Sequence, residues 1–294
     1  LKPFLIKVLI GKNQLKQKVY DTIPQFYSIE ERESLVKNFI CEILEIPLTN
    51  YLLQKEFELS EAQVINYESA LENLSKGQPL QYIVGKAFFY GREFSVNSKV
   101  LIPRPETEEL CQWIIEDTTL NNPCILDIGC GSGNIPITLE QEIKNSSVFA
   151  IDISTDALGV AQENCKLNNS KVQFEQMDIL NWQTATKFFE NKFDVIVSNP
   201  PYILEKEKIF MRKNVVDFEP HLALFVEQNP MLFYDTIAEF AKEHLTENGK
   251  LFFEINENYY TECKNVLLKM NFVNIELRKD FGGKYRMIKG EFIK

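Results

Sequence analysis

Beyond Pro105 the sequence alternates between short apolar runs and longer amphipathic segments, and this alternation constrains the fold more than any other feature. Parallel strands need crossover connections, so strands that alternate with helices favour a doubly wound, mostly parallel sheet. Residues 273–277 and 286–289 have a turn at Gly282-Gly283 between them and no helix, which predicts a closing antiparallel hairpin. The other strands are predicted near residues 123–128, 147–151, 171–175, 193–198 and 248–254. The expected fold is therefore α/β, with a doubly wound, seven-stranded sheet.

The first 85 residues have the pattern of a small helical domain. Tyr67, Leu71 and Leu74 recur at spacings of four and three, which is typical of the buried face of a helix. Ser60 and the Gln three residues later predict a capping box at its start, and Gly77 predicts its end. Residues 87–90 and 93–96 are β-prone runs around a Gly-Arg pair and predict a hairpin. We expect an all-helical domain over 1–85, a β-hairpin linker over 86–105 and the α/β domain over 106–294.

Composition and charge argue against several classes of protein. The net charge of −10 disfavours direct binding of nucleic acid, which needs a clustered basic surface. The six cysteines form no C-x-x-C pair and there are two histidines, so neither a disulfide framework nor a metal site is indicated. Lysines interrupt the apolar run over 1–10, and no stretch approaches the roughly 20 apolar residues that span a bilayer. We expect a cytoplasmic protein without a membrane segment or an export signal.

A glycine-rich segment follows the first predicted strand of the α/β domain. Its alternate glycines let backbone amides approach a ligand closely. A dinucleotide fingerprint would have its third glycine at position 134, where Asn134 stands, and a P-loop would have a lysine, so pyrophosphate is disfavoured. Asp127 at the strand end would attract the cationic part of an amino acid rather than a phosphate. The candidate cofactor residues here are Asp127, Gly129, Cys130, Gly131, Ser132 and Gly133.

Two more acidic residues follow the next two predicted strands. Asp152 can accept both hydrogen bonds of a ribose diol, and Asp178, next to Ile179, is placed to accept from the exocyclic amine of adenine. Taken alone, Asp178 is as well explained by a helix cap. Because the carboxyl ends of parallel strands meet at one edge, the glycine loop and both aspartates together indicate an adenosine-containing cofactor.

The strand near 193–198 runs directly into Asn199-Pro200-Pro201-Tyr202 at the same predicted edge. The prolines fix φ and remove backbone donors, so the turn presents carbonyl acceptors in a stiff geometry. The Asn199 side-chain oxygen and the Pro200 carbonyl can each accept one hydrogen of an NH2 group, and Tyr202 offers an aromatic wall. Holding both hydrogens would aim the nitrogen lone pair at an electrophile without a strong base. Asn199, Pro200 and Tyr202 are the predicted catalytic residues.

With these motifs the chain resembles class I S-adenosylmethionine methyltransferases that carry an N-P-P-Y motif. More narrowly, it resembles the release-factor glutamine methyltransferases of the PrmC/HemK family. The narrow resemblance rests on residues 78–85, 89–91, 100–110, 219–224 and 279–286. Residues 228–231 depart from the acidic-glycine pair usual in that family, and the first 75 residues match only in helical character and length.

The resemblance implies a Rossmann-like methyltransferase sheet and methyl transfer from S-adenosylmethionine to N5 of the glutamine in the Gly-Gly-Gln loop of peptide chain release factors. S-adenosylhomocysteine is the implied product. The helical domain would bind the substrate protein, Arg104 and Glu106 would shape the substrate entrance, and the protein would act as a monomer. The implied cofactor residues are those of the glycine loop with Asp152, Asp178, Ile179 and Asn199, and the implied glutamine residues are Asn199, Pro200, Pro201 and Tyr202.

Other readings of these residues remain open. A nucleic-acid methyltransferase acting on an exocyclic amine of adenine or guanine would fit the same turn, although the acidic balance counts against it. A cofactor-binding scaffold without catalysis would be expected to have lost Asn199 or a cofactor acid, and all are present. Arg104 and Glu106 can also be explained as members of a salt-bridged domain junction.

Overall fold

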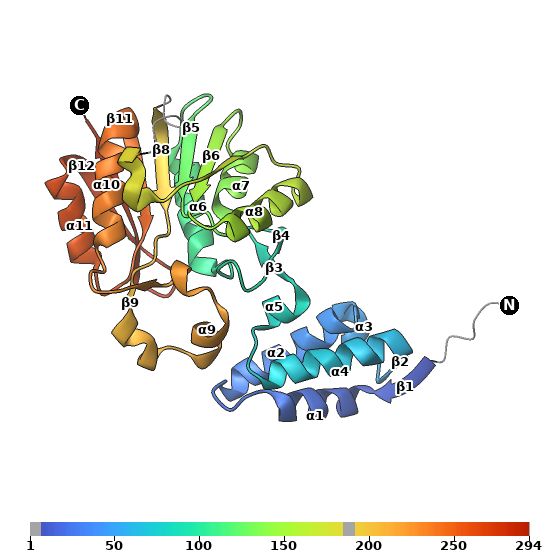
Figure 1. Ribbon diagram of the computed structural model, residues 1–294. Coiled ribbons are helices and arrows are strands. Elements are labelled where there is room, and N and C mark those ends of the chain that lie inside the picture. The colour runs from blue at the N-terminus through green and yellow to red at the C-terminus, as the bar shows by residue number, and fades with distance from the viewer. Residues whose placement is uncertain (1–6, 185–191, 294) are drawn as a thin grey trace. The chain divides into compact units, whose positions relative to one another are not determined.

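The computed structural model describes residues 7–184 and 192–293 (Figure 1). It divides into two compact units, Leu1–Gly85 with Met211–Phe218, and Lys86–Phe210 with Glu219–Lys294. The first six residues of the expected helical domain lie outside the described residues. No pattern in the sequence predicts that residues 211–218 group with the first unit. In the described part of the chain, no helix has the length and apolarity needed to cross a membrane.

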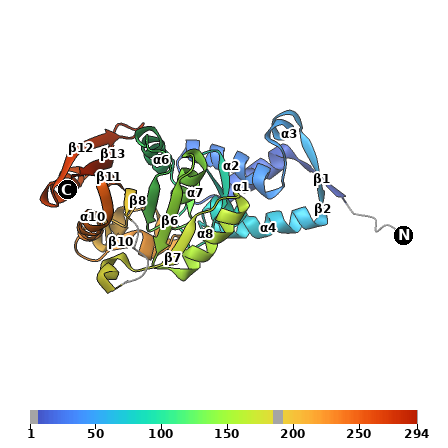
Figure 2. The ribbon, with the colours of Figure 1, turned by 90° about the horizontal axis from the view of Figure 1, so that it is seen from above.

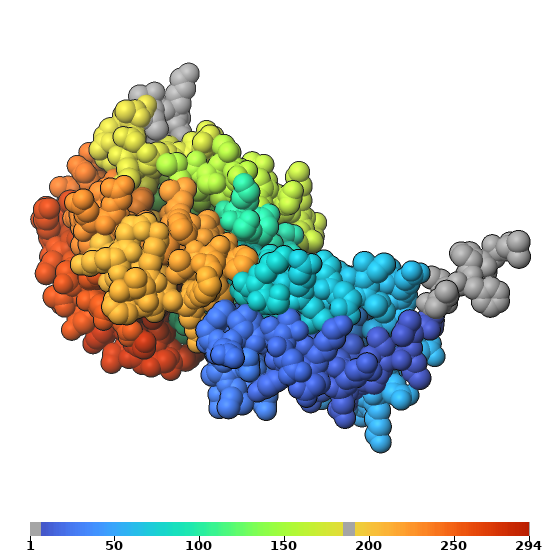
Figure 3. All heavy atoms as spheres, turned by 60° about the horizontal axis from the view of Figure 1, so that its bottom comes forward, coloured from blue at the N-terminus to red at the C-terminus, as the bar shows by residue number. Residues whose placement is uncertain are grey.

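The first unit is mainly helical, as predicted, around a core that includes Phe39, Ile40 and Leu74. Helix α4 begins with the predicted capping box at Ser60 and is followed by Gly77, which has a positive φ of 87°. Residues 7–85 of this unit form the blue and cyan body of Figure 3. Its elements are β1 (Lys7–Gly11), α1 (Lys12–Thr22), α2 (Ile29–Ile43), α3 (Leu48–Leu53), β2 (Glu56–Ser60), α4 (Glu61–Ser75), α5 (Leu80–Val84) and α9 (Lys213–Phe218).

Strands β1 and β2 correct the expectation that this unit is all helical. They pair antiparallel, with Val8 opposite Leu59 and Ile10 opposite Phe57. In β2 the side chains of Phe57 and Leu59 are buried, those of Glu56 and Glu58 are exposed and that of Ser60 is half-buried, so this short run has the period of two that a strand requires. Between two helices, a run this short is a weak signal in the sequence.

The second unit contains the predicted seven-stranded sheet, in the order β12-β13-β11-β8-β5-β6-β7 (Figure 2). Its strands are β5 (Cys124–Ile128), β6 (Ser147–Asp152), β7 (Gln173–Gln176), β8 (Phe193–Ser198), β11 (Leu245–Glu254), β12 (Phe272–Lys279) and β13 (Tyr285–Phe292). Strands β5, β6, β7, β8 and β11 run parallel, and β13 joins β11 and β12 antiparallel. The doubly wound α/β fold and its closing hairpin are confirmed.

Helices cover both faces of this sheet, so its central strands are apolar on both sides. Leu126 and Ile196 belong to the core beneath one set of helices, while Ile125 and Val195 belong to the core beneath the other. Neighbouring strand residues thus face opposite layers. The first set is η1 (Ile179–Thr184), α10 (Leu232–His244) and α11 (Tyr260–Lys269), and the second is α6 (Pro105–Asp117), α7 (Asn134–Glu142) and α8 (Thr155–Leu167).

The predicted hairpin is present as β3 (Lys86–Phe89) and β4 (Arg92–Ser95), which pair antiparallel. The fully buried Asn164 of α8 accepts a hydrogen bond from the Ser95 amide and donates to the carbonyl oxygens of Ser95 and Ser132. This one side chain therefore ties the hairpin to the glycine-rich loop. The remaining short elements, between β8 and α10, are β9 (Ile203–Leu204), η2 (Glu205–Phe210), η3 (His221–Ala223) and β10 (Phe225–Val226).

Candidate active site

A cavity of about 350 Å³ lies at the carboxyl ends of the parallel strands, within the second unit. It is lined by most of the residues that the sequence singled out: Arg104, Gly129, Cys130, Gly131, Ser132, Asp152, Asp178, Ile179, Asn199, Pro200 and Pro201. The segments after β5, β6, β7 and β8 meet here because each follows a parallel strand of one sheet, whereas Arg104 reaches the cavity from the start of α6. Asp127, Gly133, Tyr202 and Glu106 are not among the lining residues.

The glycine loop between β5 and α7 follows an irregular backbone path. Gly129, Gly131 and Gly133 all have positive φ, between 54° and 80°, which favours glycine at these positions. A Cβ atom at Gly129 or Gly131 would meet nothing within 4 Å, whereas at Gly133 it would lie 3.1 Å from Ala161 Cβ. The first two glycines therefore leave open space beside the backbone, and the third allows α7 and α8 to pack closely.

The two aspartates that follow β6 and β7 are already engaged with the backbone around them. Asp152 Oδ2 accepts from the Gly131 amide and Oδ1 from the Ser154 amide, both at 2.9 Å. Each carboxylate oxygen still has a free lone-pair direction for a ribose hydroxyl. Asp178 Oδ1 accepts from the Leu180 amide and Oδ2 from the Asn181 side chain, so Asp178 caps η1 as well as lining the cavity.

Asp127 lies completely buried at the end of β5. Neither carboxylate oxygen has a hydrogen-bond partner that meets normal geometric criteria. Burial, followed by the charge of Asp152, raises the pKa of Asp127 well above its usual range. A buried carboxylate without a partner is costly, and a nearby cation would relieve that cost. The surroundings of Asp127 therefore fit a cofactor with a positively charged group near the glycine loop.

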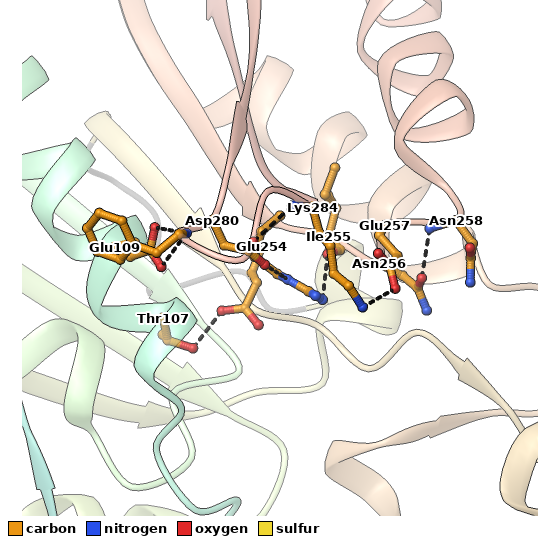
Figure 4. Close-up of polar contacts among 11 residues, drawn as sticks. Thr107, Glu109, Glu254, Ile255, Asn256, Glu257, Asn258, Asp280 and Lys284 are labelled. Atoms are coloured by element: carbon orange, nitrogen blue, oxygen red, sulfur yellow. Dashed lines mark hydrogen bonds and ion pairs between the residues drawn. The ribbon is translucent and has the colours of Figure 1, made fainter. Parts of the chain in front are cut away.

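Asn199 follows β8 and lines the cavity, and its side-chain amide meets a buried pair of residues. Asn199 Nδ2 donates to Thr107 Oγ1 at 3.4 Å. The Thr107 hydroxyl in turn donates to Glu254 Oε2 at 2.5 Å. Figure 4 shows Thr107 on α6 and Glu254 at the end of β11 pointing toward one another. Both side chains are almost fully buried, with exposed fractions of 2% for Thr107 and 4% for Glu254.

Tyr202 is half-buried next to a second polar pair. Burial, followed by the charge of Glu254, raises the pKa of Tyr202 to about 12, while Arg286 and Arg104 act in the opposite direction. The phenol is therefore neutral at pH 7. Arg286 Nε donates to Asp280 Oδ2 at 3.1 Å, and the main-chain amide of Phe281 donates to the Glu109 carboxylate (Figure 4). These contacts fix the turn between β12 and β13 against α6.

Arg104, at the start of α6, forms an ion pair with Glu219 at 2.6 Å. The Glu219 side chain is 1% exposed and also accepts from the Ile102 amide. Arg104 lines the cavity, so it has both a structural partner and access to the site. Glu106 is half-buried, and its charge contributes to raising the pKa of Glu254.

Sequence reasoning missed Thr107, Glu254 and Asn164 as parts of the site. Thr107 and Glu254 are 147 positions apart, so no local pattern connects them. One signal was available, because Glu254 ends the apolar run Leu251-Phe252-Phe253 and an acidic residue there is unusual. No group of three or more His, Cys, Asp or Glu among residues 7–184 and 192–293 is arranged to hold a metal ion, and all six cysteines are free.

Comparison with protein families gives two matches. The family described as "Methyltransferase small domain" matches residues 109–217, and the family described as "PrmC N-terminal domain" matches residues 26–85. Solved structures share the fold. A methyltransferase from Pyrococcus furiosus has a TM-score of 0.51 and 18% identity over 70% of this chain and 91% of its own. The Thermus thermophilus 16S rRNA N2 G1207 methyltransferase RsmC, solved with AdoMet and guanosine, has a TM-score of 0.50 and 18% identity over 70% of this chain and 49% of its own.

Two curated proteins are much more similar in sequence. The release factor glutamine methyltransferase of Flavobacterium psychrophilum is 44% identical over 269 residues, which cover 88% of this chain and 93% of that protein. The release factor glutamine methyltransferase of Bacteroides thetaiotaomicron is 37% identical over 280 residues, covering 94% of this chain and 98% of that protein. Identity of this level over nearly the full length of both relatives confirms the narrow resemblance. The chain belongs to the release factor glutamine methyltransferase family.

Proposed function

We propose that this protein transfers a methyl group from S-adenosylmethionine to the side-chain amide nitrogen of the glutamine in the Gly-Gly-Gln loop of peptide chain release factors, with S-adenosylhomocysteine as the second product. The observation that carries the proposal is the Asn199-Pro200-Pro201-Tyr202 turn, which directly follows the carboxyl end of β8 beside the cavity that the glycine loop lines. The similarity to curated release factor glutamine methyltransferases supports the same substrate.

For the cofactor, we assign the glycine loop and the acids around it. The Asp152 carboxylate accepts from the ribose diol, and Asp178 with Ile179 binds the adenine edge. Asp127 offsets the positive charge of the amino acid part, which is supported by its complete burial and by the lack of a hydrogen bond of normal geometry to either carboxylate oxygen. When bound, S-adenosylmethionine supplies an electrophilic methyl group on a sulfonium centre.

For the acceptor, we assign the turn itself. The Asn199 side-chain oxygen and the Pro200 carbonyl each accept one hydrogen of the glutamine NH2 group, and Tyr202 packs against the flat amide. Two fixed acceptors orient the nitrogen lone pair, which is otherwise delocalised into the carbonyl. A carbon–nitrogen bond forms as the carbon–sulfur bond breaks, and the nitrogen then releases a proton. Because the proton leaves after transfer, an Asn can serve where no base is needed for attack.

The other residues define how the release factor is received. We assign Arg104, held by Glu219, and Glu106 to the substrate entrance, and the helical unit to binding of the release factor protein. The reaction then takes place in the cytoplasm with the protein as a monomer.

The direct test is transfer of a radiolabelled methyl group to purified release factor. A release factor with Gly-Gly-Gln is compared with one in which that glutamine is replaced by alanine, and bulk RNA and DNA serve as parallel acceptors. Label that requires the glutamine supports the proposal. Label on nucleic acid with none on release factor would overturn the substrate, whereas no label on any acceptor would overturn the activity.

A further inference from the structure

The Asn199 side chain has two chemically different ends, and the proposed function requires one of them. Its oxygen must face the acceptor nitrogen, because an NH2 group in that place would oppose a second NH2 group, donor against donor. The two orientations of an Asn amide have nearly the same shape, so packing alone does not choose between them. A hydrogen-bonding neighbour of fixed polarity is needed to decide the orientation.

The Thr107 hydroxyl is a hydrogen-bonding neighbour of this kind. When Glu254 is ionised it can only accept, so the one hydrogen of the Thr107 hydroxyl is directed to Glu254 Oε2, at 2.5 Å. The side of Oγ1 that faces Asn199 then has only lone pairs. It can accept from Asn199 Nδ2, at 3.4 Å, and cannot donate to Asn199 Oδ1. With Nδ2 engaged by Thr107, Oδ1 is left on the other side of the amide.

The main chain at Glu254 is held in place by a buried hydrogen bond. The Tyr234 hydroxyl donates to the Glu254 main-chain oxygen at 3.1 Å, which fixes the end of β11. The Glu254 carboxyl is buried, and burial raises its pKa to about 7, while the Thr107 hydrogen bond and the charges of Arg286 and Arg104 counteract the rise. Thr107 is therefore the side-chain donor that favours the ionised form of Glu254.

We propose that Thr107, oriented by Glu254, is a positioning residue that sets the Asn199 amide with its oxygen toward the acceptor nitrogen. This inference rests on the proposed function, because it names the residues that align the catalytic amide. It assigns Thr107, in the first turn of α6, a role in the methyl-transfer step that is separate from binding. Neither Thr107 nor Glu254 forms or breaks a covalent bond in this role.

The test compares two substitutions of one side chain. Thr107→Val keeps the shape and removes the hydroxyl, whereas Thr107→Ser keeps the hydroxyl and removes a methyl group. We expect Thr107→Val to lower kcat by about 10-fold, the factor expected for one lost hydrogen bond. KM for release factor and Kd for S-adenosylmethionine should stay within about 2-fold of wild type, because binding contacts are unchanged. Thr107→Ser should keep most of the wild-type kcat.

A matched control comes from Thr138 of α7, which is also fully buried but whose hydroxyl has no hydrogen-bond partner. Thr138→Val should therefore leave kcat unchanged. A wild-type kcat in Thr107→Val would overturn the proposal, as would equal losses in Thr107→Val and Thr107→Ser, which would indicate packing. If Thr107→Val does not fold, Glu254→Leu decides instead. Leucine offers no acceptor, so the Thr107 hydroxyl hydrogen is free to turn toward Asn199, and kcat should fall while Kd for S-adenosylmethionine stays within about 2-fold of wild type. An unchanged kcat in Glu254→Leu would overturn the proposal.

The two proposals fail in different ways. If wild-type protein methylates no release factor, the proposed function fails. If wild-type protein is active and Thr107→Val is equally active, only the positioning role fails.

Discussion

The two halves of the sheet edge handle buried acidic groups differently. We define the cofactor side as the edge formed by β5, β6 and β7. There the Asp127 carboxylate is buried, and neither oxygen has a hydrogen bond of normal geometry. On the acceptor side, formed by β8, β11 and β13, Glu254 is buried just as deeply but holds the Thr107 hydroxyl at 2.5 Å. Asp280, on the same side, pairs with Arg286.

This difference indicates how each half works. On the cofactor side, a bound ligand with a positive charge can lower the cost of burying the Asp127 carboxylate, so this side gains most from ligand binding. The acceptor side is satisfied by the protein's own residues and is therefore organised before the substrate arrives, which is what orientation of a weak nucleophile requires. Substitutions on the two sides should accordingly change different measured quantities.

The largest effect is expected for Asn199→Ala on the acceptor side. Loss of one preorganised polar contact should lower the rate of methyl transfer on the order of 100-fold. Affinity for S-adenosylmethionine, measured by isothermal titration, should stay within a few-fold of wild type, because the glycine loop, Asp152 and Asp178 are untouched. Equal losses of rate and cofactor affinity would show that Asn199 belongs to the cofactor side.

The counterpart on the cofactor side is Asp152→Ala. The lost ribose contact should weaken cofactor binding by roughly 1.5 to 3 kcal/mol, the range for a hydrogen bond to a charged group. Isothermal titration measures this directly, and kcat at saturating cofactor should change far less than Kd. Asp217→Ala, which removes an exposed ion pair with Lys213, is the control and should leave Kd unchanged. Unchanged binding in Asp152→Ala would remove this residue from the site.

The residues of the cofactor side could also be predicted from the sequence more completely than those of the acceptor side. Gly129, Asp152 and Asp178 each follow a strand with a clear apolar pattern, and carboxyl ends of parallel strands meet at one edge, so their convergence could be inferred. The Asn199 turn could be placed for the same reason. Predicted strand positions near 147–151 and 193–198 agree closely with β6 (Ser147–Asp152) and β8 (Phe193–Ser198).

The supporting network of the acceptor side could not be predicted, because it consists of contacts between distant positions. Thr107 and Glu254 meet only after α6 packs on the sheet beside β11. The pairing of β1 with β2 depends in the same way on a tertiary contact, since each run is short and lies beside strong helix signals. The grouping of Met211–Phe218 with the first unit rests on contacts such as Asn214 with Tyr27, which no periodicity reveals.

A smaller effect is expected where the cofactor side depends on backbone shape. Gly133→Ala places a side chain at a φ of 80° and within 3.1 Å of Ala161 Cβ and Ile137 Cδ1. We expect a loss of about 1 to 2 kcal/mol in the free energy of unfolding from the left-handed conformation alone. Gly159→Ala in α8 is the matched control, because its Cβ would meet nothing within 4 Å, and it should stabilise by roughly 0.5 to 1 kcal/mol. Thermal unfolding of both variants checks the difference, and equal midpoints would refute it.

The smallest effect is expected for Asp127→Asn, and it tests the contrast between the two sides most directly. The folded-state pKa of Asp127 is raised, so the folded state binds more protons than the unfolded state, and stability falls as pH rises above about 4, the unfolded pKa of an aspartate. The Asn variant does not titrate there and should be more stable than wild type at pH 7 without cofactor, on the order of 1 kcal/mol, or about 2–4 °C in the midpoint of thermal unfolding. Added S-adenosylmethionine should stabilise the variant less than wild type, because an amide cannot offset a positive charge as a carboxylate does. If stability depends on pH identically in the two proteins, Asp127 carries no unfavourable charge. The polar groups of the cofactor side would then be satisfied by the protein itself, as they are on the acceptor side.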